Sequence, residues 1–501
     1  MGAEALKAID QRLSLGDKLE KLTFSGSYIL IVYRCGDLLV SRDMFGGVDC
    51  YSNSSKNWIT TNFLAAIALN ESKRFSKNEL TEYVLFGLTF GNQTIIEGIS
   101  LLDTTKIFNL TKRSMIKKRI EIPPVETNLT KCLNENLDVL IHEFEGYARG
   151  FDGKIVAALS GGFDTRLMLA LILEVGAIPD LYVYGSESDK DVIVAKDIAQ
   201  GEGFPLLHIN RGRYPKVDKE DFINVVESNY YDLDLPLTLF SDRSDVDTRK
   251  MRSQSGDLVL NGAGGGVFRD QWKWDFRERS LYDIFRNSYD IGHLEKINID
   301  TNDFFSNIEM KMRDMVSSFF QIGREVSRQQ TEMIFPIYRS KFYSTGNTVN
   351  NYFGNATLPF MSQPVLLQSF SVPHELKRYG EFERLMIKKL NPKLASYMSD
   401  YGFNFTTGPA LKRKFMERLY SMMPPKIKTK IKSMTSFSQK SLVSAPKTPA
   451  PYLKADYLNQ VIDPSANVVG SYIENIDVIK NQNVLRRIYA FEYLAVKNDI
   501  L

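Results

Sequence analysis

The chain has 501 residues, of which 43% are hydrophobic, 25% charged and 12% aromatic, a composition that excludes global disorder and collagen-like repeats. Because one hydrophobic core stops growing at roughly 250–300 residues, we expect two or three domains. The 63 basic and 60 acidic residues give a net charge of +3, which argues against nucleic acid or an acidic membrane as the main partner.

The first part of the chain has the pattern of a small α+β unit. Residues 28–33 and 37–41 are short β-rich runs on either side of a turn, which predicts an antiparallel hairpin. Residues 78–88 have helical spacing of their apolar side chains. A polar, lysine-rich stretch with two prolines, residues 111–127, indicates a connector. We therefore place a domain boundary near residue 120, which divides the chain into residues 1–120 and 121–501.

The second part alternates apolar runs with amphipathic segments. A long helix is predicted over residues 130–147. Continuous apolar runs follow at residues 155–159, 181–184, 205–209 and 258–260, with helices predicted over residues 165–175 and 189–201. Buried-type strands that alternate with helices predict an α/β fold with a doubly wound parallel sheet. From residue 280 onward the pattern is mostly helical.

The most informative residues follow the first apolar run, in the string Leu159-Ser160-Gly161-Gly162-Phe163-Asp164-Thr165-Arg166. Consecutive glycines at a helix N-terminus let backbone N–H groups approach an anion closely. Ser160 and Thr165 add hydroxyl donors, and Asp164 offers a carboxylate that can hold Mg²⁺ against a phosphate. The simpler alternative is a tight turn with Asp164 or Thr165 as the N-cap. The complete string in a strand–helix context favours a phosphate-binding loop.

This string resembles the PP-loop, SGGxDS, of the N-type ATP pyrophosphatases, and its surroundings are similar to the asparagine synthetase family. Residues 259–266 are similar to the second glycine-rich loop of that family. Residues 358–361 and 372–377 resemble its PFLD…PxELK region, and residues 383–388 fall where a catalytic lysine is usually found. The resemblance covers roughly residues 20–400, and only the PP-loop is specific by itself.

The resemblance implies an ATP-dependent ligase that adenylates a carboxylate, releases pyrophosphate and transfers ammonia or an amine to form an amide. ATP and Mg²⁺ are the cofactors that it implies, and a small-molecule or peptide carboxylate is the substrate. Arg384 would stabilise developing negative charge, since an arginine does not give up its proton. Arg166 would reach phosphate, although a structural or surface role is equally compatible with its position. The other implied roles are Mg²⁺ binding by Asp164, pyrophosphate binding by Ser160, Gly161, Gly162 and Thr165, and adenylate binding by Asn261 and Gly262.

The second glycine-rich loop departs from the family pattern GEGADE. The family's acidic positions are occupied here by Ala263, Gly266 and Val267, so the loop has no carboxylate. Mg²⁺ would then be held by Asp164 and the triphosphate alone, or with help from Asp270 or Asp275. A third possibility is that turnover has been lost, which leaves a nucleotide-binding scaffold. An intramolecular cyclase similar to β-lactam synthetases and lasso-peptide cyclases is a further alternative.

The N-terminal part departs further. Residues 42–51 are similar to a stretch of the family's glutaminase domain, which has the N-terminal nucleophile fold and begins with Cys after the initiator Met. Residue 2 is Gly2 here, and 120 residues are fewer than the roughly 150–200 of a typical domain of this kind. We expect a degenerate remnant without glutaminase activity, so that ammonia or an amine replaces glutamine.

The remaining features indicate a soluble cytoplasmic protein. Cys35, Cys50 and Cys132 have spacings of neither a disulfide framework nor a metal site, and Cys35 and Cys50 are expected to be small buried hydrophobes. The N-terminus lacks a signal peptide, and no apolar run approaches the roughly 18 residues of a membrane span.

Other side chains are assigned simpler roles. The four histidines show no zinc-site spacing, and His208 is expected to be a satisfied core residue. The basic segment 411–440 is expected to be a solvated face, with an anionic substrate, a carrier protein or a membrane surface as the alternative partners. Trp272, Trp274 and Phe276 are expected to pack rather than to line a pocket. The sequence does not indicate the oligomeric state.

Overall fold

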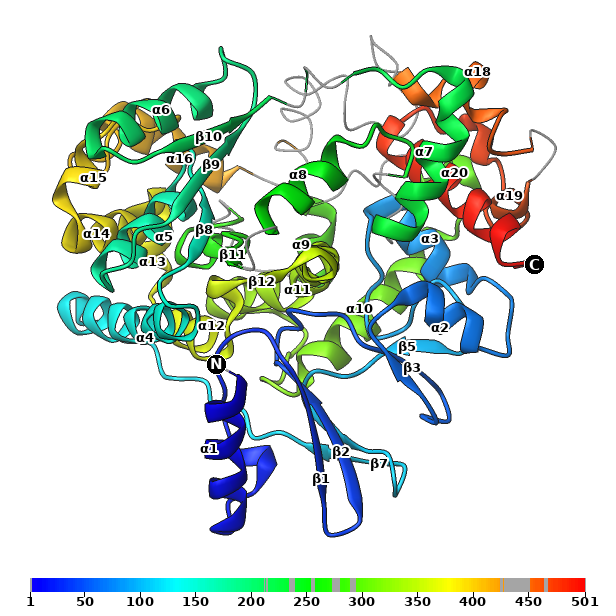
Figure 1. The fold of residues 1–501 in the computed structure, drawn as a ribbon, viewed down its shortest axis with the longest axis horizontal. Coiled ribbons are helices and arrows are strands. Elements are labelled where there is room, and N and C mark those ends of the chain that lie inside the picture. The colour runs from blue at the N-terminus through cyan, green and yellow to red at the C-terminus, as the bar shows by residue number, and fades with distance from the viewer. Residues whose placement is uncertain are drawn as a thin grey trace.

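Five parallel strands form the central sheet of the computed structural model, in the order β10-β9-β8-β11-β12 (Figure 1). The structure describes residues 2–210, 212, 215–233, 239–253, 257–272, 280–288, 294–423, 427, 451–463 and 467–500. The strands are β8 (Ile155–Ala158), β9 (Asp180–Tyr184), β10 (Leu206–Ile209), β11 (Leu258–Leu260) and β12 (Asn355–Thr357). The predicted α/β class with a parallel sheet is confirmed.

Both faces of this sheet are buried. Alternate residues of the strands belong to two different hydrophobic clusters, with Ile155 and Ala157 in the main core and Val156 in a smaller cluster on the opposite face. The helices α5 (Phe163–Glu174) and α6 (Lys190–Glu202) contribute to the main core. Burial on both faces explains why the strands are continuous apolar runs in the sequence rather than alternating ones.

The chain reverses its direction of winding at the centre of the sheet. From β8 it proceeds outward through β9 to β10, and it then returns to add β11 and β12 on the other side of β8. The switch point lies between β8 and β11, whose carboxyl ends lead into the two glycine-rich loops. In open α/β sheets, ligands bind at this kind of position.

The strand β12 was not predicted, because its three residues lie inside a stretch with a mostly helical pattern. It pairs with β11, with Ala356 opposite Val259. A strand this short carries no periodic signal, so only its pairing defines it.

The helices predicted in the α/β part are confirmed with small shifts of their ends. The helix α4 (Leu129–Gly150) replaces the expected 130–147 and packs against α5 and α12. Beyond the sheet the described chain is mostly helical, as expected. The later helices are α7 (Lys219–Leu233), α8 (Ser244–Ser253), α9 (Leu281–Ser288), α10 (Thr301–Ser317), α11 (Arg328–Phe353), α12 (Gln363–Ser369), α13 (His374–Lys377), α14 (Glu381–Leu390), α15 (Pro392–Ser396), α16 (Leu411–Met422), α18 (Ala455–Leu458), α19 (Val468–Tyr472) and α20 (Gln482–Lys497), with short 3-10 helices between several of them.

The N-terminal residues form two small antiparallel sheets, in the orders β1-β2-β6-β7 and β4-β3-β5. The predicted hairpin is confirmed, since β1 pairs with β2 and Ile31 lies opposite Val40. The elements are α1 (Gly2–Ser14), β1 (Ile29–Arg34), β2 (Asp37–Arg42), β3 (Tyr51–Asn53), β4 (Ile59–Thr60), α2 (Phe63–Leu69), α3 (Lys77–Phe86), β5 (Ile99–Leu101), β6 (Lys106–Asn109) and β7 (Ser114–Lys117).

The C-terminal helix returns to this N-terminal region (Figure 1). Phe491 of α20 contacts Tyr83 of α3 edge to face at 5.3 Å and lies 6.3 Å from Phe75. Such aromatic pairs add to the burial of their apolar area. The C-terminal helix therefore packs against the part of the chain that precedes the predicted boundary near residue 120.

One expectation about the cysteines is wrong. Cys50 is fully buried, as predicted, but Cys35 is exposed at the turn between β1 and β2, with a φ of 50°. A residue at the tip of a hairpin faces solvent whatever its hydrophobicity. All three cysteines are free, in agreement with their spacing.

Two glycines lie within long helices without any neighbour to exclude a side chain. A Cβ built at Gly146 of α4 or at Gly346 of α11 meets no heavy atom within 4 Å. We expect Gly146→Ala and Gly346→Ala each to raise the free energy of unfolding by about 0.5–1 kcal/mol, because alanine loses less chain entropy on helix formation. Denaturant unfolding measures this, and a loss of stability in both variants would contradict it.

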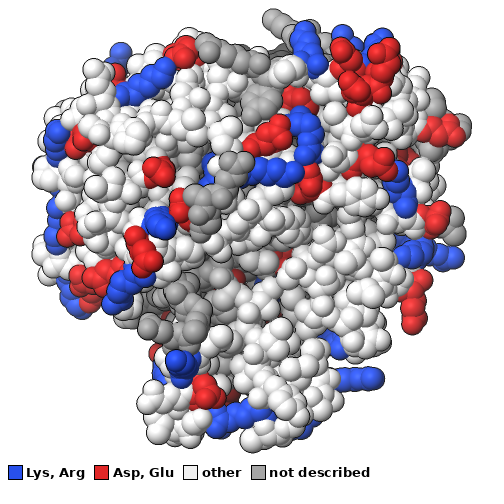
Figure 2. Space-filling model, viewed as in Figure 1, with Lys and Arg blue, Asp and Glu red and all other residues white. Residues whose placement is uncertain are grey.

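In the described part of the chain, none of the helices combines the length and the apolar character needed to cross a bilayer. Figure 2 shows basic and acidic side chains intermixed over one face of the molecule, in line with the near-neutral net charge.

Candidate functional site

The predicted phosphate loop lies at the carboxyl end of β8, directly before α5. Its two hydroxyls hold the loop in shape. The Ser160 and Thr165 hydroxyl oxygens are 2.9 Å apart, the Ser160 N–H donates to Thr165 Oγ1 at 3.1 Å, and the Gly162 N–H donates to Ser160 Oγ at 3.2 Å. The loop also lies directly before the N-terminus of α5, where the helix dipole has its positive end.

Acidic side chains also lie at the loop. The Gly161 N–H donates to Asp191 Oδ1 at 2.9 Å. A Cβ at residue 161 would lie 2.8 Å from both the backbone N and the Cβ of Asp400, so only glycine fits there. Burial raises the pKa of the Asp400 carboxyl, and the charge of Asp191 raises it further. An incoming phosphate would therefore have to replace Asp191 at the Gly161 N–H group, and protonation of Asp400 would reduce the repulsion.

The second glycine-rich loop touches the first. It joins β11 to the 3-10 helix η3 (Gly265–Phe268), and a Cβ at Gly265 would lie 2.6 Å from Asp164 Oδ1. Gly264 has a φ of +93°, which favours glycine. The Asn261 side-chain oxygen accepts the Ala263 N–H at 3.0 Å, and a Cβ at Gly262 would lie 3.8 Å from the Asp164 Cβ. The fold thus brings together the predicted residues of both loops.

The cation that contacts Asp164 is Arg269, which was not predicted from the sequence. Its Nη2 lies 2.6 Å from Asp164 Oδ1, and its Nε lies 3.2 Å from Glu383 Oε2. Its guanidinium carbon lies 5.2 Å from the ring centre of Phe163. The sequence signal that could have indicated this role is a basic residue placed soon after a glycine-rich loop that lacks carboxylates.

Glu383 of α14 also faces Asp164. Its side chain is fully buried, and burial raises the pKa of its carboxyl well above the ordinary value, while Arg269 opposes this and a hydrogen bond with Asp164 adds to it. Burial therefore favours the protonated form of Glu383, and Arg269 contacts both this carboxyl and that of Asp164.

The arrangement does not offer a ready magnesium site. Asp164 is bound to Arg269, Glu383 favours its protonated form, and the second loop supplies no carboxylate. Mg²⁺ requires several oxygen ligands in octahedral geometry. Asp270, which was considered as a substitute ligand, is instead bound to Arg328 and His374, and Asp275 lies outside the described residues. The residues present therefore do not fit Mg²⁺ in this conformation.

The two arginines named from the sequence have other partners. The Arg166 guanidinium is fully buried, donates to the carbonyls of Tyr397 at 2.8 Å and Met398 at 2.9 Å, and lies 4.4 Å from the ring centre of Phe405. Desolvation lowers its pKa to about 10. Arg384 is bound to Glu381 of its own helix and donates to the Phe405 and Thr406 carbonyls at 3.0 Å. Their proposed roles in phosphate binding and charge stabilisation stay predictions.

A cavity of about 270 Å³ adjoins the loop on the side of Arg269. Its walls include the rings of Phe163 and Tyr401. Arg378, Arg413 and Arg418 also line it, and Asp270 and Glu417 are its acidic residues. Arg413 and Arg418 of the basic segment 411–440 line this cavity, although most of the described residues of the segment are exposed, as expected for a solvated face. Residues 424–426 and 428–440 lie outside the described part of the chain.

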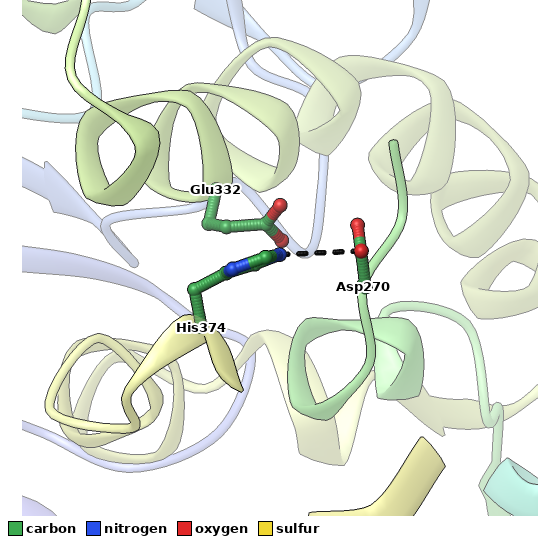
Figure 3. A group of neighbouring side chains, drawn as sticks. All are labelled: Asp270, Glu332 and His374. Carbon is green, nitrogen blue, oxygen red and sulfur yellow. Dashed lines mark hydrogen bonds and ion pairs between the residues drawn. The ribbon is translucent and has the colours of Figure 1, made fainter. Parts of the chain in front are cut away.

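Asp270, Glu332 and His374 form a second cluster, shown in Figure 3. Their candidate ligand atoms lie within 4.8 Å of one another, a geometry that scattered histidines in the sequence did not predict. However, the Arg328 guanidinium contacts all three, at 2.5 Å from Asp270, at 2.8 Å from Glu332 and in a short contact with His374. A guanidinium among these groups supplies the positive charge that a metal ion would bring.

Two smaller expectations are confirmed wholly or in part. His208 is satisfied, with Nε2 2.8 Å from the Gly185 carbonyl and Nδ1 3.1 Å from Glu187, but it lies on the edge strand β10 and is only partly buried, so it is not a core residue. Trp272 is buried, donates from its indole to the Thr331 carbonyl at 3.1 Å and packs on Phe335. Trp274 and Phe276 lie outside the described residues.

Comparisons with known proteins add little to this site. No protein-family model matches the chain, and no curated protein sequence matches it. Among solved structures, a glutamine-dependent NAD⁺ synthetase from Acinetobacter baumannii in complex with ADP is similar over 60% of this chain and 72% of its own, with 14% sequence identity and a TM-score of 0.18. A TM-score this low supports no inference about function, so the site has to be judged by its own geometry.

Proposed function

We propose that this chain is an ATP-dependent ligase that activates a carboxylate as its adenylate and forms an amide. One observation carries the proposal. The two glycine-rich loops meet at the carboxyl ends of β8 and β11, at the switch point of the parallel sheet, with Gly265 in contact with Asp164. Ligands of α/β sheets bind at this position, and a glycine-rich loop at a helix N-terminus is suited to phosphate.

The reaction has two steps. A carboxylate oxygen of the substrate attacks the α-phosphorus of ATP, the bond to the bridging oxygen breaks, and pyrophosphate leaves. Ammonia or an amine of the substrate then attacks the acyl carbon, loses a proton and displaces AMP. Both steps build negative charge that fixed donors and cations stabilise.

The chain's own residues supply these groups in the proposal. The Gly161 N–H group, once Asp191 is displaced from it, and the N-terminus of α5 would contact the pyrophosphate, and Arg269 supplies the positive charge beside Asp164. The adjoining cavity, with Arg378, Arg413 and Arg418 in its wall, accommodates the carboxylate substrate. No step requires a protein-bound metal, although ATP in solution carries Mg²⁺ of its own.

The direct test is to incubate the purified protein with MgATP, a panel of carboxylates, and ammonia or small amines. We expect AMP and pyrophosphate in equal amounts, and formation of ADP and phosphate would contradict the proposal. Asp164→Ala should abolish product formation, because it removes the partner of Arg269 at the loop. Asp180→Ala is the matched control, since Asp180 is exposed at the amino end of the neighbouring strand β9.

A second candidate, a nucleotide-binding scaffold without turnover, is favoured by the Asp164–Arg269 ion pair and by the missing carboxylates of the second loop. Calorimetry with ATP and with AMP distinguishes the two: binding without product for any substrate supports the scaffold. An intramolecular cyclase remains within the ligase proposal, and a product that is one water lighter than its substrate would identify it.

A further inference from the structure

A second cavity lies far along the chain from the glycine-rich loops and has a different chemistry. Its volume is about 360 Å³, which corresponds to roughly twelve water molecules at about 30 Å³ each. It lies where the N-terminal elements meet α11 and α20, and it shares no lining residue with the cavity beside Arg269. Apolar side chains form most of its wall, among them Phe63, Leu88, Ile95, Phe342 and Phe491.

Three charged residues line this cavity, and the side chains of two of them have hydrogen-bond partners. Asp49 accepts hydrogen bonds from the Ser344 hydroxyl at 2.7 Å and the Thr345 hydroxyl at 3.0 Å. Arg249 is paired with Asp245 at 2.8 Å and donates to the Gly346 carbonyl at 3.2 Å.

The third charged group is Lys341 of α11, and it differs from the other two. Its ammonium nitrogen is buried and has no hydrogen-bond partner among the residues that the structure describes. Lys341, Asp49 and Leu101 also line a smaller adjoining cavity of about 140 Å³. A buried ammonium without a partner is costly unless an anion or a proton loss compensates it.

We propose that this cavity is a binding site for a small carboxylic acid with an aromatic or branched aliphatic body, whose carboxylate pairs with Lys341. One unpartnered ammonium matches one negative charge, which favours a monoanion over a phosphate that needs several donors. The rings and aliphatic side chains of the wall match an apolar body, and pockets of this size and character are typical small-molecule sites. The assignment does not depend on nucleotide binding at the two loops.

The charged surroundings of Lys341 give the site a distinct pH dependence. Burial is the main cause that lowers the pKa of Lys341 to about 8. The negative charges of Glu82 on α3 and of Asp49 raise this pKa. The positive charges of Lys311 on α10 and Arg42 on β2 lower it. A bound carboxylate favours the charged ammonium. Binding should therefore take up a proton above pH 8 and none well below it, which calorimetry in buffers of different ionisation enthalpy measures.

The binding experiment uses the full chain with benzoate, phenylacetate and 3-methylbutanoate, and with benzyl alcohol as a neutral match for benzoate. We expect the carboxylates to bind at least about tenfold more tightly than benzyl alcohol, the ratio that about 1.4 kcal/mol of charge pairing gives. Lys341→Met should remove this preference while it keeps the apolar stem. Lys196→Met is the control. Lys196 lies on α6, is exposed and is paired with Glu187, and its substitution should leave binding unchanged.

Gly346→Leu provides an independent test. A side chain at Gly346 meets open space, and this residue lines the cavity, so leucine should fill the site and weaken binding of benzoate and benzyl alcohol alike. Equal affinities for the acid and the alcohol, full binding by Lys341→Met, or no binding of any carboxylate at millimolar concentration would overturn the assignment. ATP turnover at the other site leaves all of these results unaffected.

Lys341→Met also has an expected effect on stability that shows whether the variant folds. Because the folded-state pKa lies near 8 and the unfolded value near 10.5, the charged lysine destabilises the free protein below pH 8. The variant should melt at a higher temperature than the parent at pH 7. This gain in melting temperature should shrink between pH 8 and pH 10.5, because Lys341 of the parent loses its proton there and the cost of burying its charge disappears. A gain that is constant with pH would contradict an unpartnered ammonium.

Discussion

Arg269→Met should lower the free energy of unfolding by about 3 kcal/mol and reduce adenylate formation by about a hundredfold or more. The first effect follows because removal of one member of a largely buried ion pair leaves the charge of Asp164 uncompensated. The second follows because one fixed donor at a developing charge is commonly worth that much. Urea unfolding gives the stability, and pyrophosphate release at saturating ATP gives the rate.

The pairing itself can be isolated with a double-mutant cycle. Asp164→Asn in the Arg269→Met background removes the uncompensated carboxylate. The free energy of unfolding lost by the double variant should therefore be smaller, by about 1–3 kcal/mol, than the summed losses of the two single variants. Additive losses would contradict the pairing. Arg413→Met is the matched control, because Arg413 lines the same cavity but is partly exposed and paired with Glu417 on its own helix. It should cost less than about 1 kcal/mol of stability.

Arg166→Met should destabilise the fold by about 3 kcal/mol and leave the affinity of the folded protein for ATP nearly unchanged. The buried guanidinium satisfies the carbonyls of Tyr397 and Met398 and contacts Phe405. Loss of one partner leaves buried acceptors unsatisfied, at about 1–3 kcal/mol each. The measurement is urea unfolding together with ATP calorimetry at a temperature where the variant is folded.

The opposite outcome would support the role implied by the resemblance. If Arg166→Met kept its stability but lost ATP affinity, the arginine would reach phosphate rather than hold residues 397–398 against α5. Arg149→Met at the exposed end of α4 is the control and should change the free energy of unfolding by less than about 0.5 kcal/mol.

Much of the α/β part could be predicted from local patterns. The apolar run of β8, the loop at residues 160–162 and the start of α5 lie within a few residues of each other, so their chemistry is visible without knowledge of the rest of the chain. Burial on both faces of the sheet made the strands continuous apolar runs, which separated them from the amphipathic helices. The strand β12 was not predicted, because three residues are too few to show a periodic pattern and only their pairing with β11 defines the strand.

The candidate site could be predicted only in part, for a different reason. The glycines and hydroxyls of the loop are local features, but Arg269 is 105 residues from Asp164, and the sequence gives no sign that they meet. The resemblance implies a charge-stabilising role for Arg384 and none for Glu383, yet adjacent helical residues point about 100° apart, and it is Glu383 that lies beside Asp164 and Arg269. The direction of a helix face is decided by what the helix packs on.

The sequence by itself therefore determined the parallel sheet, the position of the candidate phosphate-binding loop and the lack of carboxylates in the second loop, because each is a property of a short segment. Tertiary structure alone decided that Arg269 forms an ion pair with Asp164 and that the Arg166 guanidinium is buried against backbone carbonyls. It also decided that the Lys341 ammonium, beside an apolar cavity, has no hydrogen-bond partner within the described parts of the chain. The physical reason is that ion pairing and desolvation depend on which distant segments share a volume.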